Sequence, residues 1–374
     1  MEITTDFDGA NIECVSCSQA DNIRLRIRPD NNSEHLQWFY FRLTGAKDRD
    51  CRLIIENGDQ VSYRDGFHGY RTVVSNDNSN WHRIDTSFDG KNLTIAYRPE
   101  SDSVYFAYFA PFSWEQHRRL IDKALQSSAV TYHRLGATVD GRSIELLQIG
   151  HVDKNKKKAW IIARQHPGET MAEWWMQGFL EKLLDANDPV ARQALAKYTF
   201  YIVPNMNPDG SVRGHLRTNA VGKNLNREWL EPTADQSPEV YYVRAKMEGT
   251  GVDFCLDVHG DEALPYNFIA GAQGIPSWND QKQDQLDSFQ NYLASINADF
   301  QTEKGYPVNA PGKANMTMCT AYIAEHFDCL AMTLEMPFKD TIESPIPETG
   351  WSPARCKKLA HSCLDAILHI APKL

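Results

Sequence analysis

Apolar and polar positions divide the chain into two regions with different expected architectures. Up to residue 112, short apolar or alternating runs are separated by clusters of Asn, Asp and Gly, which favour tight turns. Closely spaced strands of this kind are typical of a β-sandwich, in which each strand buries one face. We therefore predict an N-terminal antiparallel β-sandwich domain at residues 1–112. Its expected strands are residues 23–27, 38–43, 51–55, 93–97 and 104–109.

Beyond residue 112 the pattern changes to apolar runs that alternate with helical segments. This alternation is the signature of an α/β fold whose sheet is covered on both faces. We predict a second domain at residues 113–374, with a mixed, mostly parallel sheet flanked by helices. The expected strands are residues 145–149, 160–163, 199–203, 252–258, 267–270 and 330–334. The expected helices are residues 113–126, 171–184, 189–197, 238–249, 280–298, 314–325 and 353–370.

Charge and composition exclude several classes of function. The formal net charge of -10 argues against a nucleic-acid binder, because the neutralisation of phosphates needs a basic surface. No apolar run is long enough to span a membrane, so no membrane partner is expected. The acidic N-terminus lacks a secretory leader, and the eight cysteines are expected as reduced thiols. These observations predict a cytoplasmic protein and leave its oligomeric state open.

Four polar residues lie at or just past the ends of expected strands: His166, Asn205, His259 and Glu335. In open α/β sheets, ligands gather beyond the carboxyl ends of the strands. The four side chains are therefore expected near one edge of the sheet, where they could form a site.

The sequence His166-Pro167-Gly168-Glu169 places an imidazole and a carboxylate one helical turn apart. Alone, this pair is a weak signal, because His and Glu occur three residues apart by chance in many chains. His259 ends a buried run, and alone it would be expected as a histidine held by local hydrogen bonds. Together, two histidines and one glutamate are a known catalytic zinc set with one position left for water. We therefore expect these three residues to bind one Zn²⁺.

Three residues between these segments suggest recognition of an anion. Arg227 beside Asn226 could hold a carboxylate, since the guanidinium donates two parallel hydrogen bonds and the amide adds another. Arg217 could supply positive charge where an oxyanion develops. Loop arginines are otherwise usually solvated or paired with surface acids, and this alternative stays open from the residues alone.

Glu335 closes the apolar run Leu330 to Leu334. A carboxylate in such surroundings is costly unless it is paired or functional. A general base that takes a proton from zinc-bound water would fit this position. The alternative is a strand-end glutamate that turns to solvent or bonds to a nearby arginine.

Taken in order, these motifs resemble those of the zinc carboxypeptidases, and most closely those of the cytosolic carboxypeptidase branch. The resemblance rests on HPGE, on NLNREW with an Arg nine residues before its second Asn, on DVHG and on TLEM. That branch also carries an N-terminal β-sandwich, to which residues 38–41 and 104–111 are similar. The resemblance therefore spans nearly the whole chain.

The resemblance implies a role for each motif residue. His166, Glu169 and His259 ligate zinc, and Glu335 activates the water and later protonates the leaving amine. Arg217 polarises the scissile carbonyl, while Asn226 and Arg227 anchor the terminal carboxylate of the substrate. The implied enzyme is a zinc metallocarboxypeptidase that hydrolyses the C-terminal peptide bond of a peptide or protein tail.

The motifs leave the side-chain preference and one family residue open. Relatives that trim acidic tails carry a basic residue in the side-chain pocket, whereas this chain has Asp261 and Glu262 after its second histidine. The possible basic contributors are Lys304, Lys313 and Arg164. The family's mobile tyrosine, which covers the substrate, has two candidates, Tyr306 and Tyr322.

Two rival functions use the same residues. A zinc amidohydrolase that deacylates N-acyl amino acids, or that cleaves γ-glutamyl cell-wall peptides, needs a similar set of groups. A non-catalytic zinc protein that only binds a peptide tail is the rival from another class. Glu335 argues against mere binding, because a binder has no need of that carboxylate.

Overall fold

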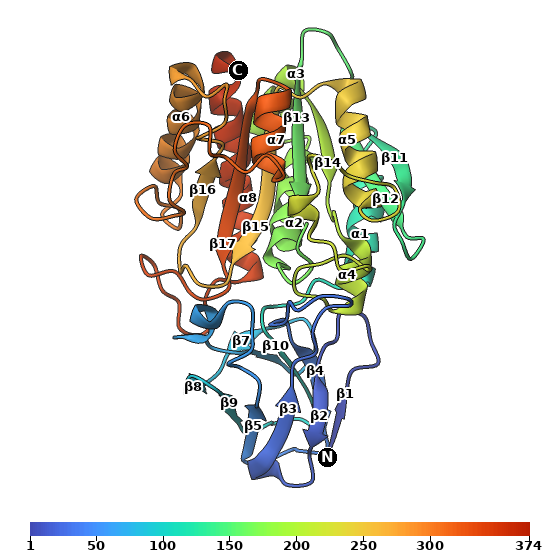
Figure 1. Ribbon diagram of the computed structural model, residues 1–374, viewed down its shortest axis with the longest axis vertical. Coiled ribbons are helices and arrows are strands. Elements are labelled where there is room, and N and C mark those ends of the chain that lie inside the picture. Colours follow the sequence, from blue (N-terminus) through green and yellow to red (C-terminus); the bar gives the residue numbers. More distant parts are fainter.

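The first ten strands form an N-terminal unit of two five-stranded sheets, as a computed structural model of residues 1–374 shows (Figure 1). One sheet has the strand order β1-β4-β10-β6-β7, and the other has the order β2-β3-β5-β9-β8. Buried and half-buried positions alternate along Ile23–Arg26, because successive side chains of a strand point to opposite faces. The strands are β1 (Glu2–Thr4), β2 (Glu13–Ser16), β3 (Ile23–Arg26), β4 (Tyr40–Thr44), β5 (Cys51–Ile55), β6 (Val73–Ser75), β7 (His82–Arg83), β8 (Thr86–Phe88), β9 (Leu93–Tyr97) and β10 (Ser103–Ala107).

Every strand pair of this N-terminal unit is antiparallel except β3–β5, which is parallel. Strand β4 lies between these two in the sequence but belongs to the other sheet, so the chain returns to the second sheet in its original direction. The predicted N-terminal β fold is confirmed, with this one parallel pair as a difference. Five strands were not predicted: β1, β6, β7 and β8 have only two or three residues, and β2 has four residues that are exposed or half-exposed, so none carries a recognisable pattern.

The rest of the chain forms an α/β unit around a seven-stranded sheet of order β11-β12-β14-β13-β15-β17-β16. Strands β14, β13, β15 and β17 are parallel neighbours, and antiparallel pairs complete both edges. The predicted mixed α/β fold is confirmed. The strands are β11 (Val130–Ala137), β12 (Ser143–Ile149), β13 (Lys157–Ala163), β14 (Tyr198–Val203), β15 (Phe254–Asp261), β16 (Phe268–Gly271) and β17 (Leu330–Pro337).

Helices cover both faces of this sheet (Figure 1). Along β13, Ala159 and Ile161 pack into one apolar cluster, while Trp160 and Ile162 pack into another. Helices α2, α3, α6 and α8 pack around the first cluster, and α5 and α7 supply the second. The helices are α1 (Trp114–Ala124), α2 (Met171–Leu183), α3 (Pro189–Lys197), α4 (Pro208–Arg213), α5 (Pro238–Thr250), α6 (Asp280–Ile296), α7 (Cys319–His326) and α8 (Pro353–Ile370).

Some elements differ from the sequence-based expectation. Strand β11 was not predicted, because its residues are mostly half-exposed or exposed and carry little apolar signal. Helix α7 begins at Cys319 rather than at residue 314, since residues 301–318 form a long loop. Strand β15 continues to Asp261, so His259 lies within the strand and not just past its end.

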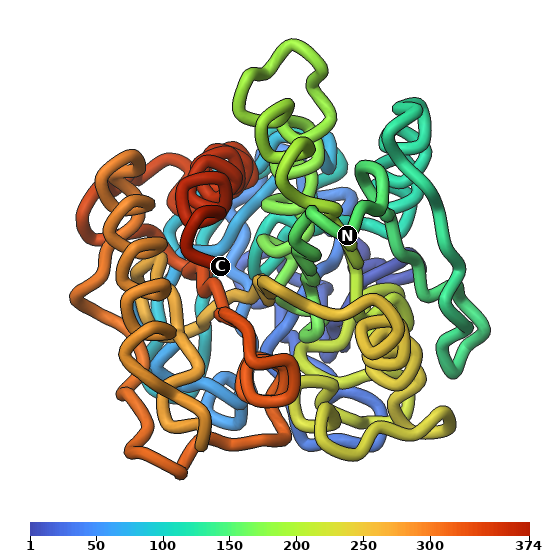
Figure 2. The backbone as a smooth tube through the Cα atoms, turned by 90° about the horizontal axis from the view of Figure 1, so that it is seen from above, coloured from blue at the N-terminus to red at the C-terminus, as the bar shows by residue number.

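The N-terminal unit and the α/β unit are stacked end to end and share one core. Viewed from above, most of the blue N-terminal unit lies behind the α/β unit (Figure 2). The rings of Tyr108 and Phe338 stack across the junction with centroids 4.5 Å apart. The buried guanidinium of Arg83 donates from Nη2 to the Phe338 carbonyl at 2.6 Å. No helix of the chain has the length and apolar character needed to cross a bilayer.

Candidate active site

Two segments that are distant in the sequence bring His166, Glu169 and His259 together at the carboxyl ends of the central strands β13 and β15. His166 and Glu169 lie between β13 and α2, and His259 lies on β15, which pairs in parallel with β13. One nitrogen or oxygen atom from each residue lies within 4.8 Å of the others, and all three side chains are buried. The structure therefore gathers the three expected ligands into one cluster.

Both imidazoles in this cluster turn Nδ1 towards the same carboxylate. His166 Nδ1 lies 2.6 Å from Glu169 Oε1, and His259 Nδ1 lies 2.8 Å from Glu169 Oε2. The two Nδ1 atoms are themselves 3.2 Å apart. The backbone N–H of Gly260 also donates to Glu169 Oε2 at 3.1 Å, and the Asn224 side-chain oxygen lies 3.1 Å from His166 Nε2. Two nitrogen atoms and a carboxylate oxygen thus converge on one point.

The two histidines of the cluster have opposite pKa shifts. Burial, assisted by the nearby charge of Arg217, lowers the pKa of His166 to about 3. That imidazole is therefore neutral and has a lone pair to offer. Burial acts in the same direction on His259, but Asp257 and Glu169 outweigh it and raise the pKa of His259. Imidazole nitrogen and carboxylate oxygen are preferred ligands of zinc, so the residue types of the cluster fit a divalent metal.

A chain of hydrogen bonds fixes the orientation of His259. Its Nε2 lies 2.9 Å from Asp257 Oδ2, which leaves Nδ1 directed into the cluster. The Gln165 amide donates to the same Asp257 oxygen at 2.6 Å, and the Trp229 indole donates to Gln165 Oε1 at 2.8 Å. Such partners hold a metal-binding imidazole in one tautomer and one orientation. Nothing in the sequence indicated that Gln165 would link Asp257 to Trp229.

Glu335 lies beside the cluster on the adjacent strand. Strand β17 pairs in parallel with β15, and His259 stands opposite Glu335 in the register. The carboxyl group is buried, and Oε2 has no hydrogen-bond partner. Burial is the largest cause that raises the pKa of Glu335, and the charge of Glu169 adds to it. The group is neither turned to solvent nor paired with an arginine, so both alternatives considered for it are wrong.

Arg217 and Arg227 lie close together, and neither forms an ion pair. Burial lowers the pKa of Arg227, and the positive charge of Arg217 lowers it further. The Arg227 guanidinium donates only to the backbone oxygen of Asn226, at 2.6 Å. The Asn226 side-chain oxygen accepts the backbone N–H of Cys319 at 2.9 Å, which leaves its NH₂ group without a partner. Unpaired positive charge beside a free amide donor suits a carboxylate ligand.

A cavity of about 440 Å³ opens beside Glu335 and Asn226. Most of its lining is neutral, including Thr320 and Thr333, whose hydroxyl oxygens are 2.7 Å apart. Lys304 lines the cavity but is exposed to solvent. The cavity therefore has no buried cation to match an acidic side chain.

Other charged residues considered for this pocket lie elsewhere. Asp261 accepts a hydrogen bond from a tyrosine at the cavity rim, and Glu262 packs beside Gly66 of the N-terminal unit. Arg164 is buried behind the metal-ligand loop, and Lys313 is exposed and does not line the cavity. Of the three possible basic contributors, only Lys304 contacts the cavity.

The two tyrosine candidates occupy different environments. Tyr306 lines the cavity, and its hydroxyl donates to Asp261 Oδ2 at 2.7 Å. Tyr322 is buried on α7, where its ring stacks on His326 and lies 4.7 Å from the Arg244 guanidinium. Only Tyr306 therefore has access to a ligand in the cavity.

A buried network that the motifs did not reveal supports the metal-ligand loop from behind. Arg164 adopts a φ of 59°, which is unusual for a residue with a side chain, and its Nε donates to the Pro167 carbonyl at 2.9 Å. Its guanidinium also pairs with the fully buried carboxylate of Glu173. The amide of Asn205, at the end of β14, donates to the same carboxylate at 3.0 Å. Asn205 thus serves this network rather than the cavity.

His117 on α1 extends the network to the outer strands. Its Nδ1 lies 2.7 Å from Glu173 Oε1, and its Nε2 lies 2.8 Å from Glu145 Oε2. Burial opposes a charged imidazole, but the two carboxylates outweigh it and raise the pKa of His117 to about 9. The network therefore links α1, β12 and α2 through a charged histidine.

Comparison with known protein families gives two matches along the chain. Residues 119–353, more than half of the sequence, match the zinc carboxypeptidase family. Residues 3–109 match the cytosolic carboxypeptidase N-terminal domain. The two matches occupy the α/β unit and the N-terminal unit respectively, in agreement with the motif-based expectation.

Solved structures give the same result over the full length of the chain, and a curated protein gives it over most of the chain. A metallo-carboxypeptidase from Burkholderia cenocepacia is 46% identical with a TM-score of 0.97, and 99% of each chain is covered. A metallo-carboxypeptidase from Pseudomonas aeruginosa, in complex with (2-guanidinoethylmercapto)succinic acid, is 42% identical with a TM-score of 0.97 and full coverage of both chains. Cytosolic carboxypeptidase 6 of Caenorhabditis elegans is 27% identical, with 89% of this chain and 77% of the relative covered.

Proposed function

The chain belongs to the zinc carboxypeptidase family, and on this premise we propose that it removes the C-terminal residue from peptides or protein tails. One observation carries the proposal: the His166, Glu169 and His259 cluster lies beside Glu335 and faces two arginines that have no acidic partner. A hydrolytic centre next to an unpaired cationic clamp is what cleavage at a free C-terminus requires.

We propose that His166, Glu169 and His259 hold one zinc ion. When bound there, zinc supplies Lewis acidity and lowers the pKa of a water molecule towards about 7. The contact between His259 Nε2 and Asp257 supports this assignment, because it leaves Nδ1 of His259 directed at Glu169 and the proposed metal position.

Each remaining residue has a role that follows from its position. Glu335 takes the proton from the attacking water and delivers it to the leaving amine, and its Oε2, which has no partner in the protein, supports this role. Arg217 stabilises the negative charge that develops on the carbonyl oxygen. Asn226 and Arg227 hold the terminal carboxylate, since both offer donors that the protein leaves unused.

Tyr306 is proposed as the residue that covers the bound substrate. Its ring lies at the cavity mouth, and a single hydrogen bond to Asp261 holds its hydroxyl. The mostly neutral lining of the cavity, which includes Thr320 and Thr333, supports an uncharged rather than an acidic side chain on the departing residue.

We further propose two domains, at residues 1–112 and 113–374, and a cytoplasmic location. The family matches at residues 3–109 and 119–353 support a boundary between them. The similarity to proteins named cytosolic carboxypeptidases supports the location, and the eight free cysteines agree with it.

The direct test compares peptides that end in a free carboxylate with the same peptides ending in an amide. The zinc-loaded enzyme is expected to release a free amino acid from the former and to act about 100-fold more slowly on the latter, because the clamp loses a charged partner. Equal rates on both peptides would refute the proposed role of Asn226 and Arg227 in binding the terminal carboxylate. Faster turnover of N-acyl amino acids than of any peptide would favour the deacylase alternative.

A further inference from the structure

Asp30 of the N-terminal unit reaches across the junction and holds the backbone that carries Arg217. It follows β3 in the sequence, yet it is 98% buried against the α/β unit, with 2% of its surface exposed. Its Oδ1 accepts the backbone N–H of Leu216 at 2.6 Å. Its Oδ2 accepts the N–H groups of Arg217 and Thr218 at 2.8 and 2.9 Å, and the Thr218 hydroxyl at 3.0 Å.

A second contact from the same loop holds the other side of this turn. His215 Nδ1 lies 3.0 Å from the Thr218 carbonyl, and the backbone N–H of Asn31 donates to His215 Nε2 at 3.1 Å. The carbonyl of Leu216 accepts the N–H of Gly168 at 2.9 Å, within the metal-ligand loop. The turn is therefore fixed between the N-terminal unit and the proposed zinc site.

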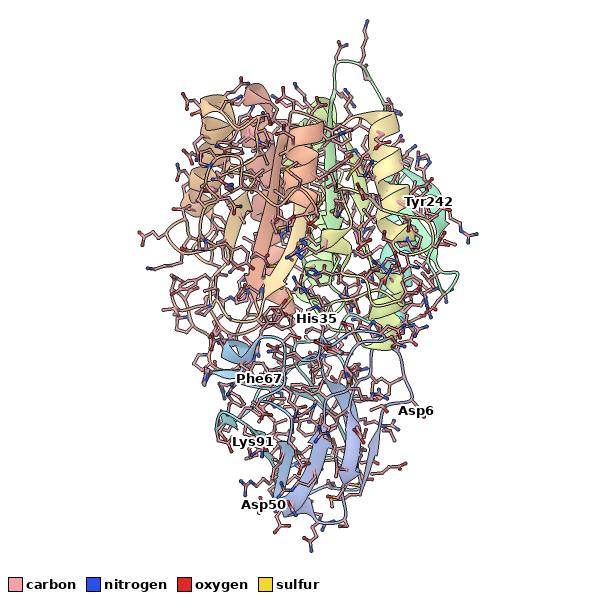
Figure 3. All side chains as sticks on the ribbon, viewed as in Figure 1. Asp6, His35, Asp50, Phe67, Lys91 and Tyr242 are labelled. Atoms are coloured by element: carbon pink, nitrogen blue, oxygen red, sulfur yellow. The ribbon has the colours of Figure 1, made fainter.

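The N-terminal unit also contacts the Arg217 side chain itself. The guanidinium carbon lies 5.4 Å from the ring centroid of Tyr63, within the range of a cation–π interaction. Arg217 forms no ion pair and no side-chain hydrogen bond within the protein. Its backbone turn and this aromatic ring are therefore the contacts that set its direction. The nearby residue His35 marks this junction in Figure 3.

We propose that Asp30 is a positioning residue for catalysis, acting through Arg217, with Tyr63 as its partner in that role. The inference rests on the proposed function, because Arg217 must stabilise the transition state for its position to matter. The active site is thus completed by the N-terminal unit, which supports the arginine that neutralises the developing oxyanion.

Asp30 can hold the Arg217 turn in place because its single carboxylate accepts hydrogen bonds from several donors of that turn. Three backbone N–H groups and one hydroxyl converge on its two oxygens, and buried N–H groups are costly to leave unpaired. In Asp30→Asn one oxygen becomes an NH₂ group that faces other donors, so the turn must shift while the side-chain volume stays the same. A shift of about 1 Å in a catalytic group can reduce turnover about 100-fold.

The test measures kcat and KM of zinc-loaded Asp30→Asn on a peptide with a free C-terminus. We expect kcat to fall about 10- to 100-fold with KM within about 3-fold, since Arg217 acts mainly in the transition state. Asp89→Asn is the matched control, because Asp89 also accepts two backbone N–H groups, those of Lys91 and Asn92. It lies in the β8–β9 hairpin, and its neighbour Lys91 is far from the junction in Figure 3, so its kcat should equal that of the wild type.

A double-mutant cycle separates positioning from general damage. In an Arg217→Met background, Asp30→Asn should cause almost no additional loss of kcat, because the group through which it acts is gone. An equal loss in both backgrounds, or a wild-type kcat in Asp30→Asn alone, would overturn the inference. If Asp30→Asn does not fold, the same cycle with Tyr63→Leu decides the question on the same criterion.

Amide hydrogen exchange tests the role of Asp30 in the turn without relying on enzyme activity, so this role can fail or hold independently of the proposed function. Exchange at residues 216–218 should accelerate at least 10-fold in Asp30→Asn and stay at the wild-type rate in Asp89→Asn. An absence of peptide hydrolysis by the wild type would refute the proposed function and leave this measurement decisive for the turn. Unchanged exchange at residues 216–218 in Asp30→Asn would then overturn the role of Asp30.

Discussion

Individual residues at the end of the parallel strands carry the proposed chemistry, and each is held by a specific neighbour. Glu335 illustrates this, because the strand register sets it opposite His259 while its Oε2 stays free of partners. Gly168 illustrates the tight packing around the metal-ligand loop. A Cβ at Gly168 would lie 2.9 Å from the Leu216 carbonyl oxygen, closer than normal contacts allow.

Substitution of Glu335 by Gln should abolish proton transfer and leave the metal site intact. We expect kcat to fall by about 10²- to 10⁴-fold, the usual contribution of a general base. Zinc content by atomic absorption should remain one ion per chain, since Gln has the same shape and the three ligands are unchanged. Retention of more than about a tenth of the wild-type kcat would exclude Glu335 as the base.

Gly168→Ala should disturb the metal-ligand loop and the Arg217 turn together. The backbone carbonyl of Leu216 must move to admit the methyl group, so we expect kcat/KM to fall about 10- to 100-fold. Gly249→Ala on helix α5 is the control, because its Cβ would meet no atom within 4 Å and alanine favours helices. Equal activity of the two variants would show that the loop tolerates the shift.

At this scale, the sequence indicated the residues that the structure gathers at the proposed site. His166, Glu169, His259 and Glu335 could be found because each follows or ends an apolar run. Asp30 and Tyr63 could not be found, because the residue that they contact, Arg217, lies more than 150 positions away in the sequence. An Asp in a turn-rich segment carries no mark that shows which backbone N–H groups it accepts. Roles that depend on distant contacts need the fold.

Elements behind the site form a rigid support, whose centre is the charged His117 between α1, β12 and α2. Arg164 transmits this support to the metal-ligand loop through the Pro167 carbonyl. Secondary structure was predicted correctly where a helical pattern of apolar residues continues over many positions, as in α2 and α8. The prediction failed for β11, whose residues are not buried on either face, and for the start of α7, where a loop carries helix-compatible residues.

The His117 network predicts a specific dependence of stability on pH. Its folded-state pKa of about 9 exceeds the usual value of 6.5, so folding favours the protonated imidazole. The stabilisation is complete below pH 6.5 and is lost as pH rises through 9, a change of about 3 kcal/mol in unfolding free energy. Urea denaturation between pH 6 and 10 measures it.

The variant His117→Gln should lack this component of the pH dependence, whereas His151→Gln, at an exposed position, should keep it. The same slope in His117→Gln and in the wild type would assign the pH dependence to other groups.

The whole molecule is a stack of two units joined by a shared core and by polar contacts at the catalytic edge. Arg83 and the Tyr108–Phe338 stack fix the junction on one side, and Asp30 fixes it at the Arg217 turn. The division into an N-terminal β region and a C-terminal α/β region could be predicted, because the apolar pattern changes from short strand-like runs to alternating strands and helices. Their mutual orientation could not, because it depends on side chains such as Arg83 that carry no pattern.

Removal of the metal should weaken the whole α/β unit as well as the activity. Binding to the folded state alone stabilises by about 4 kcal/mol when the free ion is about 1,000-fold above its Kd. We therefore expect a chelator to lower the Tm by several degrees and to abolish turnover, and zinc to restore both. An unchanged Tm after complete removal of the metal would argue against a site buried at the sheet edge.

The most direct measurement is anomalous X-ray scattering from crystals of the zinc-loaded protein, above and below the zinc absorption edge. The account predicts one peak per chain, at about 2.0–2.2 Å from Nδ1 of His166, Nδ1 of His259 and a carboxylate oxygen of Glu169. A peak bound by other residues, or no peak between these three, would contradict the assignment of the metal centre on which the proposed catalysis depends.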